Sequence, residues 1–258
     1  MTWTFNAEKE IEHIVNWIKK YFAQNGPSCK AVIGISGGKD STIAAALCAR
    51  ALGPENVVGV MMPQGKQSDL NDARQVCSIL GITAYNINIG AICNDLYQAI
   101  DMAYDYDHSV ANNVAVATNT PARIRMTTLY AIAALVHGRV CNTCNASEDY
   151  VGYSTKYGDG AGDFAPLQRY TVRELLLIGD ALEELPQNLV HKTPADGMCG
   201  KSDEENLGFT YEELDSYLLD GTYPEYDKYL AIQLKHNANL HKLRAMPTCT
   251  KLSNIIEF

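Results

Sequence analysis

The residues with the clearest chemical potential form the run GISGGKDS, which combines glycines, hydroxyls and two charges. The run overlaps the end of an apolar, β-branched stretch at residues 31–35 and leads into a helical pattern, so it predicts a strand, a glycine turn and a helix. Glycines let a backbone approach an anion closely, and hydroxyls and the free N–H groups of a helix start donate hydrogen bonds to it. We therefore expect phosphate binding at Gly34, Ile35, Ser36, Gly37, Gly38, Lys39, Asp40 and Ser41.

Asp40 makes this loop different from a Walker A motif, in which Ser or Thr follows the lysine. A carboxylate in the first helical turn would repel a polyphosphate unless a divalent cation lay between them. Magnesium prefers hard oxygen ligands from one or two carboxylates and from phosphates. The position of Asp40 therefore indicates a magnesium site, although an acidic residue there could also only stabilise the helix dipole.

Alternating strand and helix patterns surround the loop. They predict strands at 31–35, 57–62, 85–89 and 139–145, and helices between Asn6 and Gly26, from Lys39 past Leu47, and at 68–80, 91–104 and 121–137. Such alternation is typical of βαβ units, so we expect an α/β fold with an open parallel sheet, helices on both faces and a Rossmann-like order.

Capping residues predict the starts of several helices. Thr120 and Pro121 suit the cap and first position of the 121–137 helix, and Thr171 and Thr210 each begin a capping box. Residues 146–169 and 192–208 show no such pattern. Long irregular stretches within a compact domain are usually binding loops, so we expect these two to contact ligands.

Composition narrows the class of protein. The chain has 258 residues, 47% of them hydrophobic, and a net charge of −9, which suits one globular domain spanning 1–258. An acidic chain argues against nucleic-acid binding, and no run approaches the ~20 apolar residues of a membrane span. We expect a cytoplasmic protein with neither nucleic-acid nor membrane partners.

Eight cysteines in such a chain are expected to be free thiols. Cys141 and Cys144 form a CxxC that could be redox-active or bind zinc. No second CxxC or HxxxH accompanies it, so we favour a structural role.

Further motifs, in order along the chain, resemble those of the NAD synthetase family within the N-type ATP pyrophosphatases, whose fold is of the adenine-nucleotide alpha-hydrolase type. They are SGGKDS itself, NTPARIRM at 119–126, NTCNASE at 142–148, GYSTKYGD at 152–159, TPAD at 193–196 and the pair His241 and Lys242. The resemblance runs from about residue 10 to the end of the chain.

The resemblance implies a role for each matching residue. The ATP site would be the SGGKDS loop with Gln67, Thr143 and Thr193, and Asp40 with Glu148 would bind Mg²⁺. Deamido-NAD would contact Arg123, Tyr130, Lys156, Asp163, His241 and Lys242. Asp159 would be a catalytic group near the attacking ammonia. A family lysine that meets ATP is replaced by Val172, which leaves the neighbouring Arg173 as a candidate substitute.

The reaction implied by the family has two steps. The nicotinate carboxylate of deamido-NAD attacks the α-phosphorus of ATP and releases pyrophosphate, and ammonia then displaces AMP to give NAD. A glutamine-using version needs an added glutaminase domain, for which the placed motifs leave no room, so we expect ammonia as the substrate. The family also implies a homodimer with an interface near residues 91–137.

Two other functions stay open from the sequence. One is a different N-type ATP pyrophosphatase, such as a tRNA sulfur transferase that uses Cys141 and Cys144. The acidic charge weighs against this alternative. The other is a non-catalytic ATP-binding regulator, which would have less need of Glu148 as a second metal carboxylate.

Overall fold

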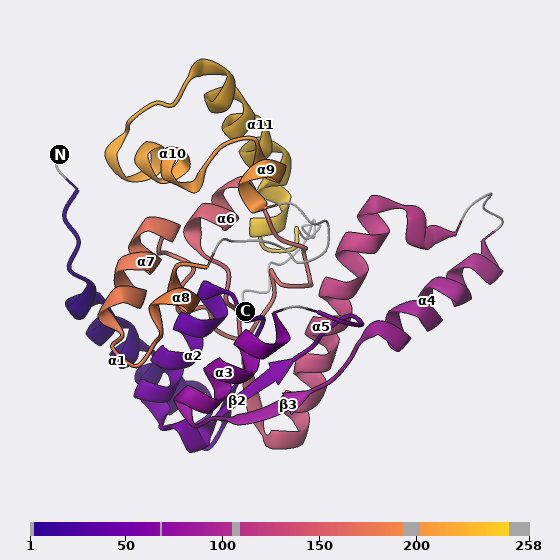
Figure 1. Cartoon of the computed structure of the whole chain (residues 1–258), viewed down its shortest axis with the longest axis horizontal. Coiled ribbons are helices and arrows are strands. Elements are labelled where there is room, and N and C mark those ends of the chain that lie inside the picture. Colours follow the sequence, from indigo (N-terminus) through magenta and orange to yellow (C-terminus); the bar gives the residue numbers. More distant parts are fainter. Residues whose placement is uncertain (1–2, 68, 105–108, 193–201, 248–258) are drawn as a thin grey trace, which may run out of the picture.

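The centre of the protein is a four-stranded parallel sheet (Figure 1). The structure, a computed structural model, describes residues 3–67, 69–104, 109–192 and 202–247. The strands are β1 (Lys30–Gly34), β2 (Val57–Met61), β3 (Thr83–Asn86) and β4 (Gly138–Cys141), in the order β3-β2-β1-β4. All three neighbouring pairs are parallel, which confirms the predicted open sheet.

Helices cover both faces of this sheet, because alternate strand residues point to opposite sides. Ala31 and Ile33 pack into one core cluster, whereas Val32 between them packs into the other. The first face is covered by α1 (Ala7–Asn25), α2 (Lys39–Leu52), α3 (Leu70–Leu80), α7 (Val172–Ala181) and α8 (Gln187–Val190), and the second by α4 (Gly90–Ala103) and α5 (Val114–Val136). Short 3₁₀ turns follow α2 and α4, at Pro54–Asn56 (η1) and Val110–Asn112 (η2).

The largest error of the sequence prediction is the start of α5. The helix begins at Val114, where the Asn113 side chain accepts a hydrogen bond from the backbone N–H of Val116. Pro121 lies inside the helix and leaves the carbonyl of Ala117 without its helical N–H partner. Strand ends also differ: β3 spans 83–86 rather than 85–89, and β4 ends at Cys141 rather than 145.

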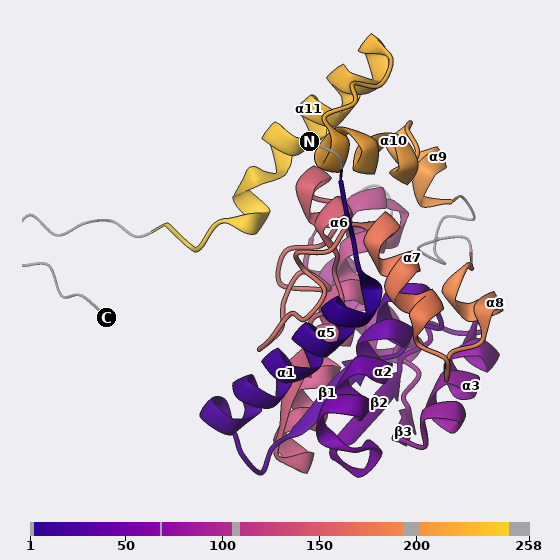
Figure 2. The ribbon, with the colours of Figure 1, turned by 90° about the vertical axis from the view of Figure 1, so that its left-hand side faces the viewer.

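The carboxyl-terminal part forms a small helical layer above the carboxyl edge of the sheet, seen at the top of Figure 1 and again in Figure 2. It contains α6 (Ala146–Val151), α9 (Asp203–Leu207), α10 (Tyr211–Asp215), the π-helical turn η3 (Ser216–Asp220) and α11 (Tyr226–Leu243). Its core includes Phe209, Leu214 and Ile232. The stretches predicted to be irregular therefore contain α6 and α9, which are too short to show a helical period.

None of the described helices is both long and apolar enough to cross a lipid bilayer.

Candidate active site

The SGGKDS loop lies at the point where the strand order changes direction. From β1 the chain passes to β2 on one side, whereas β4, the other neighbour of β1, comes later in the chain. Open α/β sheets bind ligands at such a switch point, outside the carboxyl ends of the strands. The loops after β1 and β4 meet here, and they carry SGGKDS and NTCNASE.

Gly37 is required by the shape of the loop. Its φ angle is 84°, a conformation that favours glycine. A Cβ atom on Gly37 would lie 2.8 Å from the carbonyl oxygen of Asp69 and 3.0 Å from the amide nitrogen of Ala73. The start of α3 therefore closes against the loop so tightly that only a residue without a side chain fits.

Hydrogen bonds within the loop fix its shape. The hydroxyl oxygens of Ser36 and Ser41 are 3.1 Å apart, and the Ser36 hydroxyl accepts from the N–H of Gly38 at 3.2 Å. Gly38 caps α2 without a side-chain hydrogen bond. The N–H groups of the first turn of α2 are thus not covered by a capping side chain, which is the arrangement that binds anions at a helix start.

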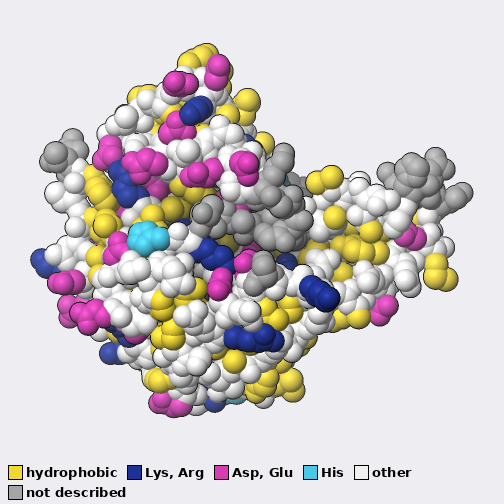
Figure 3. Space-filling view, in the orientation of Figure 1, with side chains coloured by type: hydrophobic (Ala, Val, Ile, Leu, Met, Phe, Trp, Pro, Cys, Tyr) yellow, Lys and Arg dark blue, Asp and Glu magenta, His cyan; other side chains and the backbone are white. Residues whose placement is uncertain are grey.

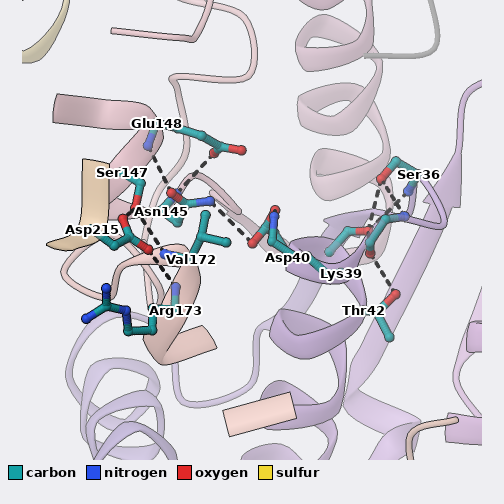
Figure 4. A network of polar contacts seen from close by, with 12 residues as sticks. Ser36, Lys39, Asp40, Thr42, Asn145, Ser147, Glu148, Val172, Arg173 and Asp215 are labelled. Atoms are coloured by element: carbon teal, nitrogen blue, oxygen red, sulfur yellow. Dashed lines mark hydrogen bonds and ion pairs between the residues drawn. The ribbon is translucent and has the colours of Figure 1, made fainter. Parts of the chain in front are cut away.

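Charged groups from two loops meet beside this helix start (Figure 4). Lys39 Nζ is 2.9 Å from Asp40 Oδ2, and the Asn145 side-chain amide donates to Asp40 Oδ1 at 3.4 Å. Asn145 also caps α6 by accepting from the N–H of Glu148, whose carboxylate accepts from the N–H of Asn145 in turn. This capping box holds Glu148 next to the Asp40 loop, although the two residues are far apart in the sequence.

The electrostatics indicate that the site is built for added positive charge. Burial, and next the Asp40 carboxylate, raise the pKa of Glu148 well above its ordinary value. Burial acts to lower the pKa of Lys39, but Asp40 and Glu148 outweigh it and raise that pKa. Two half-buried carboxylates that act on each other electrostatically are a suitable pair of oxygen ligands for Mg²⁺.

No group of three or more His, Cys, Asp or Glu side chains suited to a metal ion occurs within the described ranges. Protein side chains alone would therefore not complete a coordination shell around Asp40 and Glu148. Magnesium usually keeps several waters and takes one or two carboxylates plus substrate phosphates, so the donor set fits a cation that arrives with a polyphosphate.

A buried network fixes the α6 loop to α7 and α10 (Figure 4). Asp215 accepts from the Ser147 hydroxyl at 2.5 Å and from the backbone N–H of Arg173 at 2.7 Å, and the Ser147 hydroxyl accepts from the N–H of Val172 at 3.0 Å. Burial raises the pKa of the Asp215 carboxyl to about 6, and these hydrogen bonds oppose the shift. Ser147 precedes Glu148, so the network supports the position of that carboxylate.

Arg173, the candidate substitute for the family lysine, is bonded to the small helical layer and not to the SGGKDS loop. Its guanidinium donates to Glu212, Asp220 and Ser216 and lies over the ring of Trp3. Figure 4 shows it directed away from Lys39 and Asp40. Val172 is buried in the core of the small helical layer.

Asp159 lies close to the loop after β4. Its side chain accepts from the N–H of Thr155 at 3.0 Å, and its carbonyl oxygen accepts from the Asn142 amide at 2.8 Å. Burial raises the pKa of Asp159, while the hydrogen bond from Thr155 opposes the shift. The nearby Lys242 carries a pKa that burial lowers.

Four of the six residues expected to contact deamido-NAD are brought together. Lys156 Nζ donates to the carbonyl of His241 at 2.6 Å, and Arg123 Nε donates to the carbonyl of Lys156 at 3.3 Å. Lys242 Nζ donates to the carbonyls of Gly152 and Ser154 at 2.7 and 2.8 Å. The carboxyl end of α11 therefore docks on the 152–156 loop, beside α5.

The other two residues, Tyr130 and Asp163, contact each other. The Tyr130 hydroxyl donates to Asp163 Oδ1 at 3.2 Å, and Asp163 Oδ2 accepts from the N–H of Val140 at 2.7 Å. Burial, and then Asp163, raise the pKa of Tyr130 to about 12. Asp163 thus has a structural task on β4 in addition to any contact with a ligand.

The remaining expected ATP contacts lie in connecting loops. Gln67 lies between β2 and α3, and Thr143 lies between β4 and α6. Thr193 lies outside the described residues.

Sequence reasoning assigned no role to three residues that the tertiary structure brings near the site. Tyr211 lies against Lys39, Tyr153 donates to Asp203 at 3.3 Å, and Asp203 acts electrostatically on both Lys39 and Glu148. Nothing in the spacing of these residues along the chain indicates that they reach a loop more than 100 residues earlier.

Cys141 and Cys144 are buried free thiols. Burial raises the pKa of both, so neither is a reactive thiolate at neutral pH. Cys141 ends β4 and packs in the core, and Cys144 lies in the loop after β4.

The fold and the site define an α/β nucleotide-binding protein with a pyrophosphate-type loop at its switch point. Residues 10–248 match the NAD synthase family, so the chain belongs to this family. It is 36% identical over 242 residues to an NH(3)-dependent NAD(+) synthetase of Alkaliphilus metalliredigens. The aligned region covers 92% of this chain and 96% of the relative.

Two solved structures have a similar fold over nearly the whole chain. The NMN synthetase of Francisella tularensis superimposes with a TM-score of 0.86 at 31% identity, over 96% of this chain and all of that chain. The NH3-dependent NAD synthetase of Campylobacter jejuni, solved with a nitrate ion, gives a TM-score of 0.75 at 28% identity, over 96% and 100%.

Proposed function

We propose that this protein is an ammonia-dependent NAD synthetase, which amidates deamido-NAD with ATP and ammonia and releases AMP and pyrophosphate. The observation that carries the proposal is the meeting of the SGGKDS loop with Asn145 and Glu148 at the switch point of a NAD synthase fold. The relative from Alkaliphilus supports ammonia as the nitrogen source, because it is named for that substrate and is matched over nearly its full length.

ATP would lie with its phosphates on the N–H groups at the start of α2 and with Gln67, Thr143 and Thr193 toward the adenylate. Asp40 and Glu148 would hold Mg²⁺, which supplies the positive charge that a leaving pyrophosphate needs. Lys39 would complete that stabilisation. Fixed charges of this kind lower a phosphoryl-transfer barrier mainly by positioning and electrostatics.

Deamido-NAD would bind between α5, the 152–163 loop and the end of α11. Arg123, Lys156, His241 and Lys242 supply cationic or hydrogen-bonding groups for its phosphates, and Tyr130 with Asp163 would form a further wall. Asp159 would attract ammonium or accept the proton released when ammonia attacks, and its burial near Lys242 suits a carboxylate with that task.

A second candidate is synthesis of NMN from nicotinate mononucleotide. The Francisella structure, named an NMN synthetase, superimposes with a higher TM-score than the Campylobacter NAD synthetase, 0.86 against 0.75. The activation chemistry would be the same, since the nicotinate carboxylate is common to both acceptors. The two functions differ only in the adenylate half of the acceptor.

We also propose a homodimer formed through the arm made by α4 and α5. Figure 3 shows hydrophobic side chains gathered over this arm, which extends from the body of the molecule in Figure 1. Ile92, Leu96 and Met102 of α4 are exposed there. Exposed apolar surface of this kind commonly marks an interface.

We place the enzyme in the cytoplasm, where its nucleotide substrates are available.

The proposed function is tested by measuring amide product and pyrophosphate with ATP, Mg²⁺ and either ammonium or glutamine. Deamido-NAD and nicotinate mononucleotide are supplied in parallel. NAD made from deamido-NAD with ammonium supports the first proposal, and a much larger kcat/KM with the mononucleotide supports the second. Pyrophosphate release without either amide would move the acceptor elsewhere, and no turnover at all would favour a regulator.

A further inference from the structure

Tyr211 joins the small helical layer to the nucleotide loop. Its backbone N–H donates to the Glu204 carboxylate at 2.8 Å, and Thr210 before it caps α10. Lys39 Nζ lies 5.7 Å from the centroid of the Tyr211 ring, within the range of a cation–π contact. The ring therefore covers the lysine that the SGGKDS loop directs into the site.

The hydroxyl of Tyr211 has no hydrogen-bond partner within the described part of the chain, although the residue is only 3% exposed. Burying a hydroxyl without a partner is unfavourable, so such groups in native proteins need an explanation. The surroundings give one. Burial, and then the charges of Glu148, Asp203 and Asp40, raise the pKa of Tyr211, so its hydroxyl stays a neutral donor.

We propose that the Tyr211 hydroxyl binds the nucleotide directly, by donating a hydrogen bond to a phosphate oxygen of the magnesium–polyphosphate group held by Lys39, Asp40 and Glu148. A phosphate oxygen placed between Lys39 and the two carboxylates would give the hydroxyl the acceptor that the protein alone does not provide. This inference rests on the ATP part of the proposed function and extends it to a residue of α10.

The geometry distinguishes a ligand-binding hydroxyl from a structural one. Two buried tyrosine hydroxyls lack a hydrogen-bond partner in the described part of the chain, those of Tyr97 and Tyr211. Only the Tyr211 hydroxyl lies beside the charged groups of the SGGKDS site, since Glu148, Asp203 and Asp40 act on it and Lys39 contacts its ring. The ring of Tyr211, by contrast, already has a structural role through its packing in the core of the small helical layer. Tyr211→Phe keeps the ring, its packing and its contact with Lys39, and removes only the oxygen.

The test compares wild type with Tyr211→Phe in the full chain. Calorimetry measures the binding of Mg²⁺–pyrophosphate, spin resonance measures the binding of Mn²⁺ alone, and thermal unfolding is followed with and without Mg²⁺–pyrophosphate. Tyr97→Phe is the matched control, because it removes another buried tyrosine hydroxyl, in α4 within the core cluster of α4, α5 and the sheet.

We expect the unliganded Tyr211→Phe protein to unfold at the same temperature as wild type or slightly higher. Mg²⁺–pyrophosphate should bind it about tenfold more weakly, the effect expected when a hydrogen bond to a charged acceptor is lost. Binding of Mn²⁺ alone should be unchanged. Tyr97→Phe should bind Mg²⁺–pyrophosphate like wild type.

Three outcomes would overturn the inference. Lower stability of the unliganded variant with unchanged pyrophosphate affinity would make the hydroxyl structural. An equal loss of Mn²⁺ affinity would assign the hydroxyl to water around the cation instead of phosphate. Failure of the wild-type protein to bind Mg²⁺–pyrophosphate would remove the ligand altogether. Because none of these readouts requires NAD formation, the inference and the choice of acceptor fail separately.

Discussion

Replacing Gly37 with alanine tests how closely the phosphate loop depends on its backbone. The change places a Cβ 2.8 Å from the Asp69 carbonyl and 3.0 Å from the Ala73 amide, and it does so at a φ of 84°. Both neighbours are backbone atoms of the turn into α3, so they cannot move aside as a flexible side chain would. The loop, the turn or both must shift.

The structure supplies its own comparison for the magnitude. Gly81 also has a positive φ, 64°, but a Cβ there has no atom within 4 Å. Gly81→Ala should therefore cost only the backbone strain, about 1 kcal/mol. Gly37→Ala adds overlap worth about 1–3 kcal/mol, for a total of roughly 2–4 kcal/mol. At about 2–4 °C per kcal/mol, Gly37→Ala should unfold some 4–16 °C lower than wild type.

Thermal unfolding of the two variants, together with calorimetric titration of Mg²⁺–ATP, checks this expectation. Gly81→Ala should bind Mg²⁺–ATP normally, whereas Gly37→Ala should lose at least about tenfold in affinity, because the N–H groups of α2 move away from the phosphates. If both variants lose the same stability and Gly37→Ala binds Mg²⁺–ATP as wild type does, the close packing of the loop is not what forms the phosphate site.

Three further predictions follow from the site and the surface. Glu148→Gln should lower kcat by about 10²–10³-fold. Its melting temperature should equal or exceed that of wild type, since the change removes a carboxylate whose pKa is raised by burial. Unchanged turnover would exclude a role of Glu148 in metal binding. Asp215 has a native pKa of about 6, above its unfolded value, so its contribution to stability is fully present below about pH 4 and is lost as the pH rises through about 6. The free energy of unfolding of wild type, measured with denaturant and taken relative to Asp215→Asn, should fall by up to about 3 kcal/mol over that pH window. If the unfolding free energies of the two proteins change in parallel with pH, the raised pKa of Asp215 is contradicted. Leu96→Glu in α4 should convert a dimer to a monomer in sedimentation velocity, while Leu234→Glu on the exposed face of α11 should leave it dimeric; the reverse pattern would place the interface on α11.

The local features of the site could be predicted from the sequence, because they depend on contacts a few residues apart. The glycine turn between β1 and α2 has the predicted conformation, and the capping boxes at Thr171 and Thr210 are confirmed. The sequence predicts the start of α5 at Pro121, because a proline suits the first turn of a helix, and this prediction is wrong because Asn113 is the actual cap.

The tertiary structure alone decided which distant residues meet. Asp40 and Asn145 are 105 positions apart, and they contact each other only because β1 and β4 are neighbours in the sheet. The motif resemblance paired Asp40 with Glu148 as metal ligands, but it could not give the capping box that holds Glu148 in place or the network from Asp215 that supports it.

By itself, the sequence determined the order of the functional segments along the chain. A phosphate loop follows the first strand, a loop with an acidic residue follows the fourth, and the residues after it form the acceptor region. It did not determine that Tyr211 covers Lys39 or that Arg173 is directed away from the site. Those facts depend on how the small helical layer packs on the sheet. The local hydrophobic period of an element shows which of its faces is buried, but not which distant element covers that face.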